Sequence, residues 1–191
     1  MTSWNRLAQK LRVPVGTILG ILFLLLMHPS ARSLWIGAAI TLPGCLLRLW
    51  AAGHIEKGRV LTQGGPYALT RNPLYLGSFF MALGIIIAGQ SYWLLPAFAI
   101  FFGIVYFPVM KAEEQELLGG YGERFVEYSK RVPLFLPAFQ AAGFHSSAFQ
   151  WSRVIRNREH RNLSGLAVAQ IILILEFLFR PSIVKFLLSL L

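Results

Sequence analysis

Residues 72–110 read NPLYLGSFFMALGIIIAGQSYWLLPAFAIFFGIVYFPVM and contain no Asp, Glu, Lys, Arg or His. As a helix, these 39 residues would extend roughly 58 Å, which is about two crossings of a 30 Å hydrocarbon core. Gly89-Gln90-Ser91 lies near the middle and supplies the signals of a turn. The stretch therefore predicts a hairpin of two membrane helices, and both ends of a hairpin return to the same side of the membrane.

Three more apolar stretches predict further membrane helices. They cover residues 13–27, 33–53 and 162–179, and the second contains Pro43. The final stretch, 183–191, is too short to cross alone, so we expect it to lie in the interface or to fold back. The pattern predicts an all-α, polytopic membrane bundle of about five transmembrane helices. We interpret residues 1–191 as a single membrane domain with a small cytosolic cap over 111–161.

The composition agrees with lipid as the solvent. Hydrophobic residues make up 55% of the chain and charged residues 14%, whereas a soluble domain carries about 25% charged residues. The lone cysteine, Cys45, excludes an internal disulfide and gives no metal-site spacing. The net charge of +10 could indicate nucleic acid, but the basic residues flank apolar stretches. We therefore expect no nucleic-acid partner and interpret the charge as contact with lipid headgroups.

The basic residues also predict the orientation. If the N-terminus is cytoplasmic, 14 of the 18 Lys and Arg residues face the cytoplasm, in agreement with the positive-inside rule. These residues are Arg6, Lys10, Arg12, Lys57, Arg59, Arg71, Lys111, Arg124, Lys130, Arg131, Arg153, Arg156, Arg158 and Arg161. Only Arg32 falls in a predicted outer loop. The oligomeric state is left open by the sequence.

Two polar segments flank the predicted hairpin, and its geometry brings them to one face. The first covers residues 64–77. The second covers 113–137 and includes a short amphipathic helix, Gly122 to Lys130, with Phe125 and Tyr128 on one face. Such segments suit S-adenosylmethionine, because carboxylates accept hydrogen bonds from a ribose or an ammonium, and an arginine holds a carboxylate. Tyrosines can pack on an adenine or face a sulfonium.

Each of these features also has a simpler interpretation. Arg71 could extend toward headgroups, Tyr67 and Tyr75 could be interfacial aromatics, and the glutamates could form a solvated helix face. Glu114 has Met110, Leu117 and Leu118 as helical neighbours, whereas Glu113 neighbours Glu116. If only one of the pair is a ligand, this spacing favours Glu114.

Together the segments resemble the isoprenylcysteine carboxyl methyltransferase family. Residues 71–77, Arg-Asn-Pro-Leu-Tyr-Leu-Gly, look like its arginine-histidine-proline-x-tyrosine-x-glycine signature. Glu113-Glu114, with Tyr121-Gly122, Tyr128, Val132-Pro133 and Pro137, looks like its second signature. The resemblance covers about residues 47–137, nearly half the chain, and the ordered pair of motifs is fairly specific.

The resemblance implies an integral membrane methyltransferase with cytosolic access for S-adenosylmethionine. Carried over, the cofactor-binding residues are Tyr67, Arg71, Asn72, Pro73, Tyr75, Glu113 and Glu114. One departure is that Asn72 stands where the signature has histidine. Asparagine exchanges hydrogen bonds but does not titrate, so it can bind and cannot transfer a proton. We therefore expect an acceptor that needs no deprotonation, a carboxylate first and a thiolate second.

Several polar residues within or beside the apolar stretches have no role in the two signatures. Arg48, Arg158 and Glu159 are the candidates for catalysis, although Arg48 could equally extend to headgroups and the other two could belong to a positively charged anchor. Glu176 and Arg180 have the spacing of a helical ion pair. No metal site is expected.

Two alternatives to a lipid methyltransferase remain open at this stage. One is an NADPH-dependent membrane reductase of a sterol-like or quinone-like lipid. The other is a non-catalytic membrane protein. The predicted acceptor is lipophilic and isoprenylcysteine-like, and the sequence does not name it.

Overall fold

The computed structural model describes residues 3–56, 60–138 and 148–188, and the side chains over 14–56, 60–138 and 148–180. All regular elements in these ranges are helical and none is a strand, which confirms the predicted all-α class. Several residues of the predicted charge pattern lie outside the described residues or side chains, namely Arg6, Lys10, Arg12, Lys57 and Arg59.

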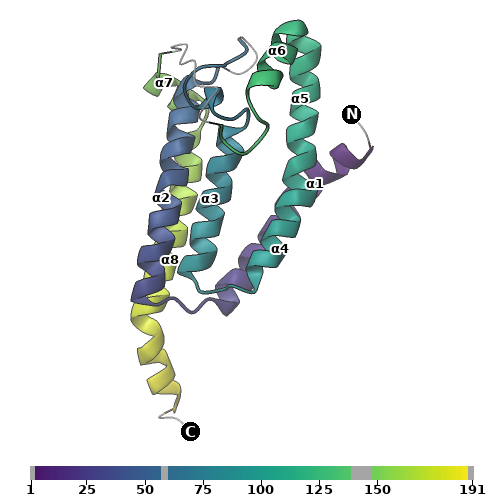
Figure 1. Ribbon diagram of the computed structural model, residues 1–191. Coiled ribbons are helices and arrows are strands. Elements are labelled where there is room, and N and C mark those ends of the chain that lie inside the picture. Colours follow the sequence, from purple (N-terminus) through teal and green to yellow (C-terminus); the bar gives the residue numbers. More distant parts are fainter. Residues whose placement is uncertain (1–2, 57–59, 139–147, 189–191) are drawn as a thin grey trace.

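Three helices stand side by side in the bundle: α2 (Ala31–His54), α3 (Pro73–Ala88) and α8 (Glu159–Leu188) (Figure 1). Glycines bring α2 and α3 into close contact. A Cβ atom on Gly84 of α3 would lie 2.1 Å from Thr41 Oγ1 and 2.6 Å from the carbonyl oxygen of Gly37, both in α2. The two backbones therefore pack at a distance that only a residue without a side chain allows.

The predicted hairpin is confirmed. After α3, the chain turns at Gly89–Ser91 and returns through α4 (Leu94–Phe101), a π-helical turn η2 (Phe102–Tyr106) and α5 (Phe107–Tyr121). The last three elements form one rod. The first turn of α3 and the last turn of α5 lie at the same end of the molecule (Figure 1).

The π-helical turn η2 has a local cause in Pro108. Proline has no backbone N–H, and its ring collides with the carbonyl group four residues earlier in a regular α-helix. The wider turn immediately before it avoids that collision, and such turns are frequent at functional sites. The turn stacks Tyr106 on Phe102, with ring centroids 4.8 Å apart and planes 8° apart.

Helix α1 (Ser3–Leu26) crosses the rod and contacts η2 and α5 (Figure 1). At the end where α1 meets the α3–α4 turn, buried apolar side chains from α1, α3, α4 and α8 form one cluster, which contains Phe23, Met27, Ile86, Ala88, Leu94 and Leu173. This cluster ties the hairpin to α1 and α8. Glu176 and Arg180 form the predicted ion pair at 3.2 Å on α8.

Within the described residues, three helical stretches are long and apolar enough to cross a membrane: Ala31–His54, Leu94–Tyr121 and Glu159–Arg180. The other two predicted spans correspond to shorter apolar helical stretches, Pro14–Leu26 and Pro73–Ala88. Of the two expectations for residues 183–191, folding back is wrong over the described part, because α8 continues without a break to Leu188, and an interfacial position stays a prediction. A proline such as Pro181 removes one hydrogen bond and need not end a helix that is otherwise continuous.

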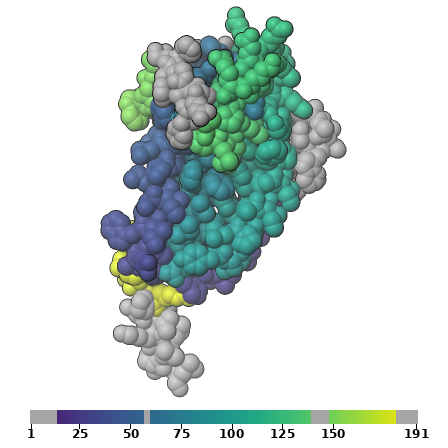
Figure 2. Space-filling model, viewed as in Figure 1, coloured from purple at the N-terminus to yellow at the C-terminus, as the bar shows by residue number. Residues whose placement is uncertain are grey.

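The cap contains a short 3₁₀ turn η1 (Gly65–Ala68), α6 (Glu123–Arg131) and α7 (Trp151–Arg156). The predicted amphipathic helix is α6, which buries Phe125 and Tyr128 against Leu61 and Tyr121. The segment after α6 then pairs with the segment before α3: Arg71 N–H donates to the Pro133 carbonyl at 2.9 Å, and Ala138 N–H donates to that of Leu69 at 2.9 Å. In Figure 2 this green segment covers the upper end of α3.

Candidate functional site

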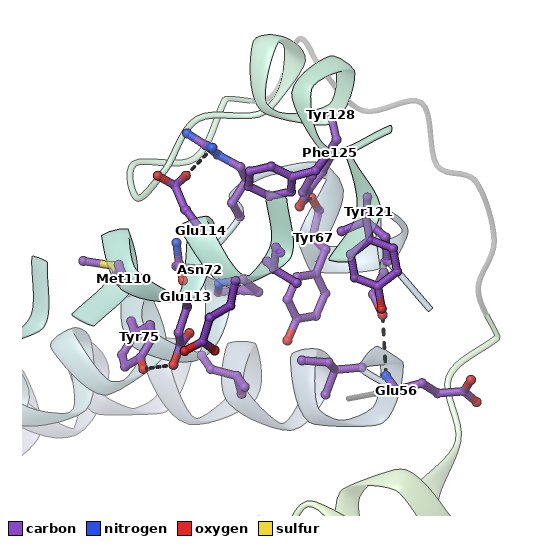
Figure 3. A pocket seen from close by; sticks show the side chains of 18 of the residues that line it. Glu56, Tyr67, Asn72, Tyr75, Met110, Glu113, Glu114, Tyr121, Phe125 and Tyr128 are labelled. Carbon is purple, nitrogen blue, oxygen red and sulfur yellow. Dashed lines mark hydrogen bonds and ion pairs between the residues drawn. The ribbon is translucent and has the colours of Figure 1, made fainter. Parts of the chain in front are cut away.

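A cavity of about 630 Å³ lies between η1, the first turns of α3, the end of α5 and α6 (Figure 3). Its volume falls within the usual range of about 300–1,000 Å³ for small-molecule sites. All seven residues that the resemblance assigns to the cofactor line it: Tyr67, Arg71, Asn72, Pro73, Tyr75, Glu113 and Glu114. The hairpin and the cap thus bring together residues that are distant in the sequence.

Arg71 and Glu114 form an ion pair across the cavity, between the segment that precedes α3 and helix α5. Each side chain is 13% exposed. Lys111 Nζ contacts the other oxygen of Glu114 at 2.8 Å, and the Arg71 guanidinium lies 6.0 Å from the centre of the Phe125 ring. The charge of Glu114 is therefore already balanced by two cations.

Glu113 has a different environment. Its carboxylate accepts a hydrogen bond of 2.7 Å from the Tyr75 hydroxyl, as the dashed line in Figure 3 shows. Within the described residues, Glu113 has no basic group within 4.0 Å. By contrast, Glu56 is paired with Arg153, and Glu159 with Arg48. Among the described residues that line the cavity, Glu113 and Glu116 are therefore the carboxylates without a basic partner, and they give this lining an excess of negative charge.

Asn72 and Pro73 have structural positions in the cavity wall. The Asn72 side-chain amide donates to the Leu134 carbonyl at 3.0 Å, which fixes the segment after α6 against the start of α3. Pro73 is buried and occupies the first turn of α3, where a proline is favourable because no N–H is needed there. The side-chain nitrogen of Asn72 thus donates a hydrogen bond within the protein.

Tyr67 projects into the middle of the cavity (Figure 3). Only 6% of the residue is exposed, and within the described residues its hydroxyl has no hydrogen-bond partner. Its backbone carbonyl accepts a hydrogen bond of 2.7 Å from the Tyr128 hydroxyl. Burial raises the pKa of Tyr67 far above its ordinary value, and nearby Tyr128 and Glu113 raise it further. The hydroxyl therefore stays protonated and can donate to a ligand.

Arg48 of α2 lines the cavity, so its side chain reaches the candidate site. Its guanidinium binds Glu159 through two nitrogens, at 2.5 and 2.8 Å, and donates to Ser78 Oγ at 2.5 Å and to the Leu74 carbonyl at 3.0 Å. These contacts join α2, α3 and α8. Asn162 Nδ2 donates to the same Glu159 at 3.1 Å and lines the cavity as well.

The remaining predictions have mixed outcomes. Glu159 is 2% exposed and lies behind Arg48, whereas Arg158 is exposed and does not line the cavity. Sequence reasoning did not select Ser78, Tyr106 or Asn162 as site residues, although all three line the cavity. A signal existed for Ser78 and Asn162, because polar side chains within apolar spans tend to be functional.

The family model for phospholipid methyltransferases matches residues 15–124, so the chain belongs to the phospholipid methyltransferase family of integral membrane methyltransferases. The resemblance inferred from the two signatures is thereby confirmed.

Two curated relatives are named for metal resistance. The chain is 32% identical over 135 residues to the nickel-cobalt-cadmium resistance protein NccN of Alcaligenes xylosoxydans xylosoxydans. The aligned region covers 66% of this chain and 62% of that protein. It is 35% identical over 92 residues to the cobalt-zinc-cadmium resistance protein CzcN of Cupriavidus metallidurans. That aligned region covers 47% of this chain and 42% of that protein. The chain thus spans less than two thirds of the length of these relatives. No solved structure matches the chain.

Proposed function

We propose that this protein transfers a methyl group from S-adenosylmethionine to a lipophilic acceptor that arrives from the membrane. The observation that carries the proposal is the charge of the cavity. Among the described residues that line it, both arginines are paired with glutamates, and the side chains with unpaired charge are the carboxylates Glu113 and Glu116. Such a cavity favours a ligand with net positive charge, and S-adenosylmethionine carries both an ammonium and a sulfonium group.

Glu113 is the carboxylate that we assign to the cofactor's positive charge. The hydrogen bond from Tyr75 holds it in place, and no cation competes for it among the described residues. Glu114, which the helical spacing favours, instead fixes Arg71. The aromatic rings of Tyr67, Tyr75 and Phe125 provide faces for the adenine or the sulfonium.

When bound, S-adenosylmethionine supplies an activated methyl group, and the residues of this chain hold the reactants in contact and exclude water. The paired Arg48 and Glu159 lie at one end of the cavity beside Ser78, and α6 borders the other end. Positioning of this kind accounts for much of the rate in a displacement reaction. Bound reactants that displace water from this cavity would limit loss of the methyl group to water.

The same charge argument opposes a nicotinamide cofactor. NADPH has a pyrophosphate and a 2′-phosphate, which need unpaired basic groups, and the two arginines among the described lining residues, Arg48 and Arg71, are both engaged by glutamates. Among the described residues, no group of three or more metal-ligating side chains occurs. If the chain shares the resistance role of its relatives, we expect it to act by modifying a membrane lipid.

A titration of the purified protein in lipid nanodiscs with S-adenosylhomocysteine and with NADPH tests this proposal. We expect S-adenosylhomocysteine to bind, and NADPH to bind at least about a hundredfold more weakly because charge-assisted contacts to its phosphates are missing. S-Adenosylmethionine should bind more tightly than S-adenosylhomocysteine, since only the former has a sulfonium. Glu113→Gln should reduce that difference, whereas Glu127→Gln, on the exposed face of α6, should preserve it. Preferential NADPH binding would contradict the proposal.

A further inference from the structure

A second cavity, of about 220 Å³, lies on the membrane side of the first, between α1, α3 and the α4–η2 rod. Its lining is apolar apart from Ser78 and the Tyr106 hydroxyl. Its wall includes Gly16 and Gly20 of α1, Ser78 of α3, and Phe102 and Tyr106 of η2. All of them belong to helices that also build the candidate site or pack against it.

Two glycines of α1, Gly16 and Gly20, maintain this space. They lie one helical turn apart on the same face, and both line the cavity. Glycines at this spacing usually let two membrane helices touch, as Gly37 and Gly84 do in α2 and α3. At Gly20, however, a Cβ would meet no atom within 4 Å, and at Gly16 the nearest atom would be 3.8 Å away. Helix packing therefore does not explain these glycines, and the volume they leave is available to another molecule.

The two cavities meet at Ser78 and Tyr106, which line both. Tyr106 is stacked on Phe102 of the apolar cavity and makes an edge contact of 5.8 Å with Tyr75 of the candidate site. Tyr75 in turn holds Glu113. A chain in the apolar cavity would thus end next to the residues that we assign to the cofactor.

We infer that the apolar cavity binds one hydrocarbon chain of the methyl acceptor and so selects single-chain lipids over diacyl phospholipids. The inference rests on the proposed function. An engineered cavity of about 150 Å³ holds one benzene ring. On that scale, about 220 Å³ accommodates roughly eight to ten carbons of one chain. The volume of about 220 Å³ leaves no room in this cavity for the second chain of a diacyl lipid.

The location of the reacting group follows from this placement. With its chain between α1 and α4, the acceptor would present its polar end at the junction formed by Ser78 and Tyr106. Arg48 is near that point, and its charge is balanced by Glu159. The length of the cavity limits how far the acceptor's chain can enter. The length of that chain therefore determines whether the acceptor's polar end reaches the cofactor.

Photocrosslinking in nanodiscs of a diacyl phospholipid tests the inference directly. One probe is a photoreactive decanoic acid, and the other is a diacyl phosphatidylcholine with the same photoreactive group. Gly20→Leu adds a side chain to the cavity wall at a position where a Cβ meets no atom within 4 Å, and Gly165→Leu is the matched control, because Gly165 is also exposed on an apolar helix with no atom within 4 Å of a Cβ. Crosslinked peptides are located by mass spectrometry.

We expect the single-chain probe to label residues 14–26 and 94–106 in the parent protein. Labelling there should fall about tenfold in Gly20→Leu, because the added side chain occupies the cavity, and should persist in Gly165→Leu. Equal labelling of these peptides in Gly20→Leu, or equal labelling by the diacyl probe in the parent, would overturn the inference. S-Adenosylhomocysteine affinity, measured in parallel, should be the same in all three proteins. If the parent labels as expected but does not bind S-adenosylhomocysteine, the chain site stands and the proposed function falls.

Discussion

Arg71 and Glu114 meet in an ion pair that joins the start of one hairpin arm to the end of the other. Each side chain is mostly buried, so each depends on the other for the compensation of its charge. The pair thereby fixes the distance between the two signature segments. It also leaves Glu113 as the neighbouring carboxylate with free charge.

The first prediction concerns this pair. Arg71→Ala should weaken S-adenosylhomocysteine binding and also destabilise the cap, because it removes a charged hydrogen-bonding group worth about 1.5–3 kcal/mol. Adding Glu114→Gln to Arg71→Ala should recover part of the lost stability, since the unpaired carboxylate is then neutral. A double-mutant cycle followed by thermal unfolding measures this coupling. Strictly additive effects of the two substitutions would show that the pair makes no energetic contribution.

The second prediction concerns Arg48 and Glu159. Their side chains are 12% and 3% exposed, and removal of one partner from a buried pair costs about 3–5 kcal/mol. Arg48→Met or Glu159→Leu alone should therefore destabilise the α2–α3–α8 bundle strongly, and the double substitution should be much less harmful. Denaturation of the four proteins in detergent checks the order. The double variant should still bind S-adenosylhomocysteine, because neither residue is assigned to the cofactor.

The third prediction concerns Tyr67 and Tyr128. Tyr128→Phe should cost about 1 kcal/mol, because it removes the hydrogen bond to the Tyr67 carbonyl, whereas Tyr67→Phe should be neutral or stabilising because that hydroxyl has no described partner. The raised pKa of Tyr67 means that the unfolded chain loses this proton near pH 10 while the folded protein keeps it. Stability should therefore be unaffected by this group below that pH and should fall above it.

The Tyr67→Phe variant provides the check on that sign. Its loss of stability between pH 9 and 11 should be shallower than that of the parent by up to about 1.4 kcal/mol per pH unit, the contribution of one titrating group. Chemical denaturation at a series of pH values measures the slope. An identical slope in both proteins would mean that the buried hydroxyl is not linked to unfolding.

The fourth prediction concerns orientation. We expect the N-terminus, residues 53–71 and residues 111–161 to face the cytoplasm, because most of the basic residues lie there. In a Cys45→Ala background, cysteines at Val60 and Arg124, both exposed, should react with a membrane-impermeant maleimide only from the cytoplasmic side. Reaction of the two positions from opposite sides would contradict the candidate cofactor site, because that site needs both segments on the same side of the membrane.

The sequence was informative where one helix or one motif carried the signal. A long stretch without charge predicted the hairpin, and the turn at Gly89–Ser91 predicted its reversal. Hydrophobic periodicity predicted α6 and the burial of Phe125 and Tyr128. Helical spacing also predicted that Glu114 would be turned toward the protein, and its side chain is 13% exposed.

Properties that depend on distant partners could not be predicted in this way. Nothing near Glu159 in the sequence indicates that it binds Arg48, because the contact arises from the packing of α8 against α2. For the same reason, spacing favoured Glu114 as a ligand but could not show that Arg71 and Lys111 neutralise it. The π-helical turn had a visible cause in Pro108, yet a proline alone does not distinguish a kink, a break and a wider turn.

The central claim is that Glu113 and its neighbours hold S-adenosylmethionine for transfer of its methyl group to a lipid. Its most direct test is a single-turnover reaction in nanodiscs with S-adenosylmethionine labelled in the methyl group and a total membrane-lipid extract. We predict that label enters the organic phase at a rate that is nearly constant from about pH 6 to 8, as expected for a carboxylate acceptor with a pKa near 4, and that Glu113→Gln slows this transfer while Glu127→Gln does not. Label that remains entirely in the aqueous phase with the parent protein, under conditions in which S-adenosylmethionine is bound, would contradict the account.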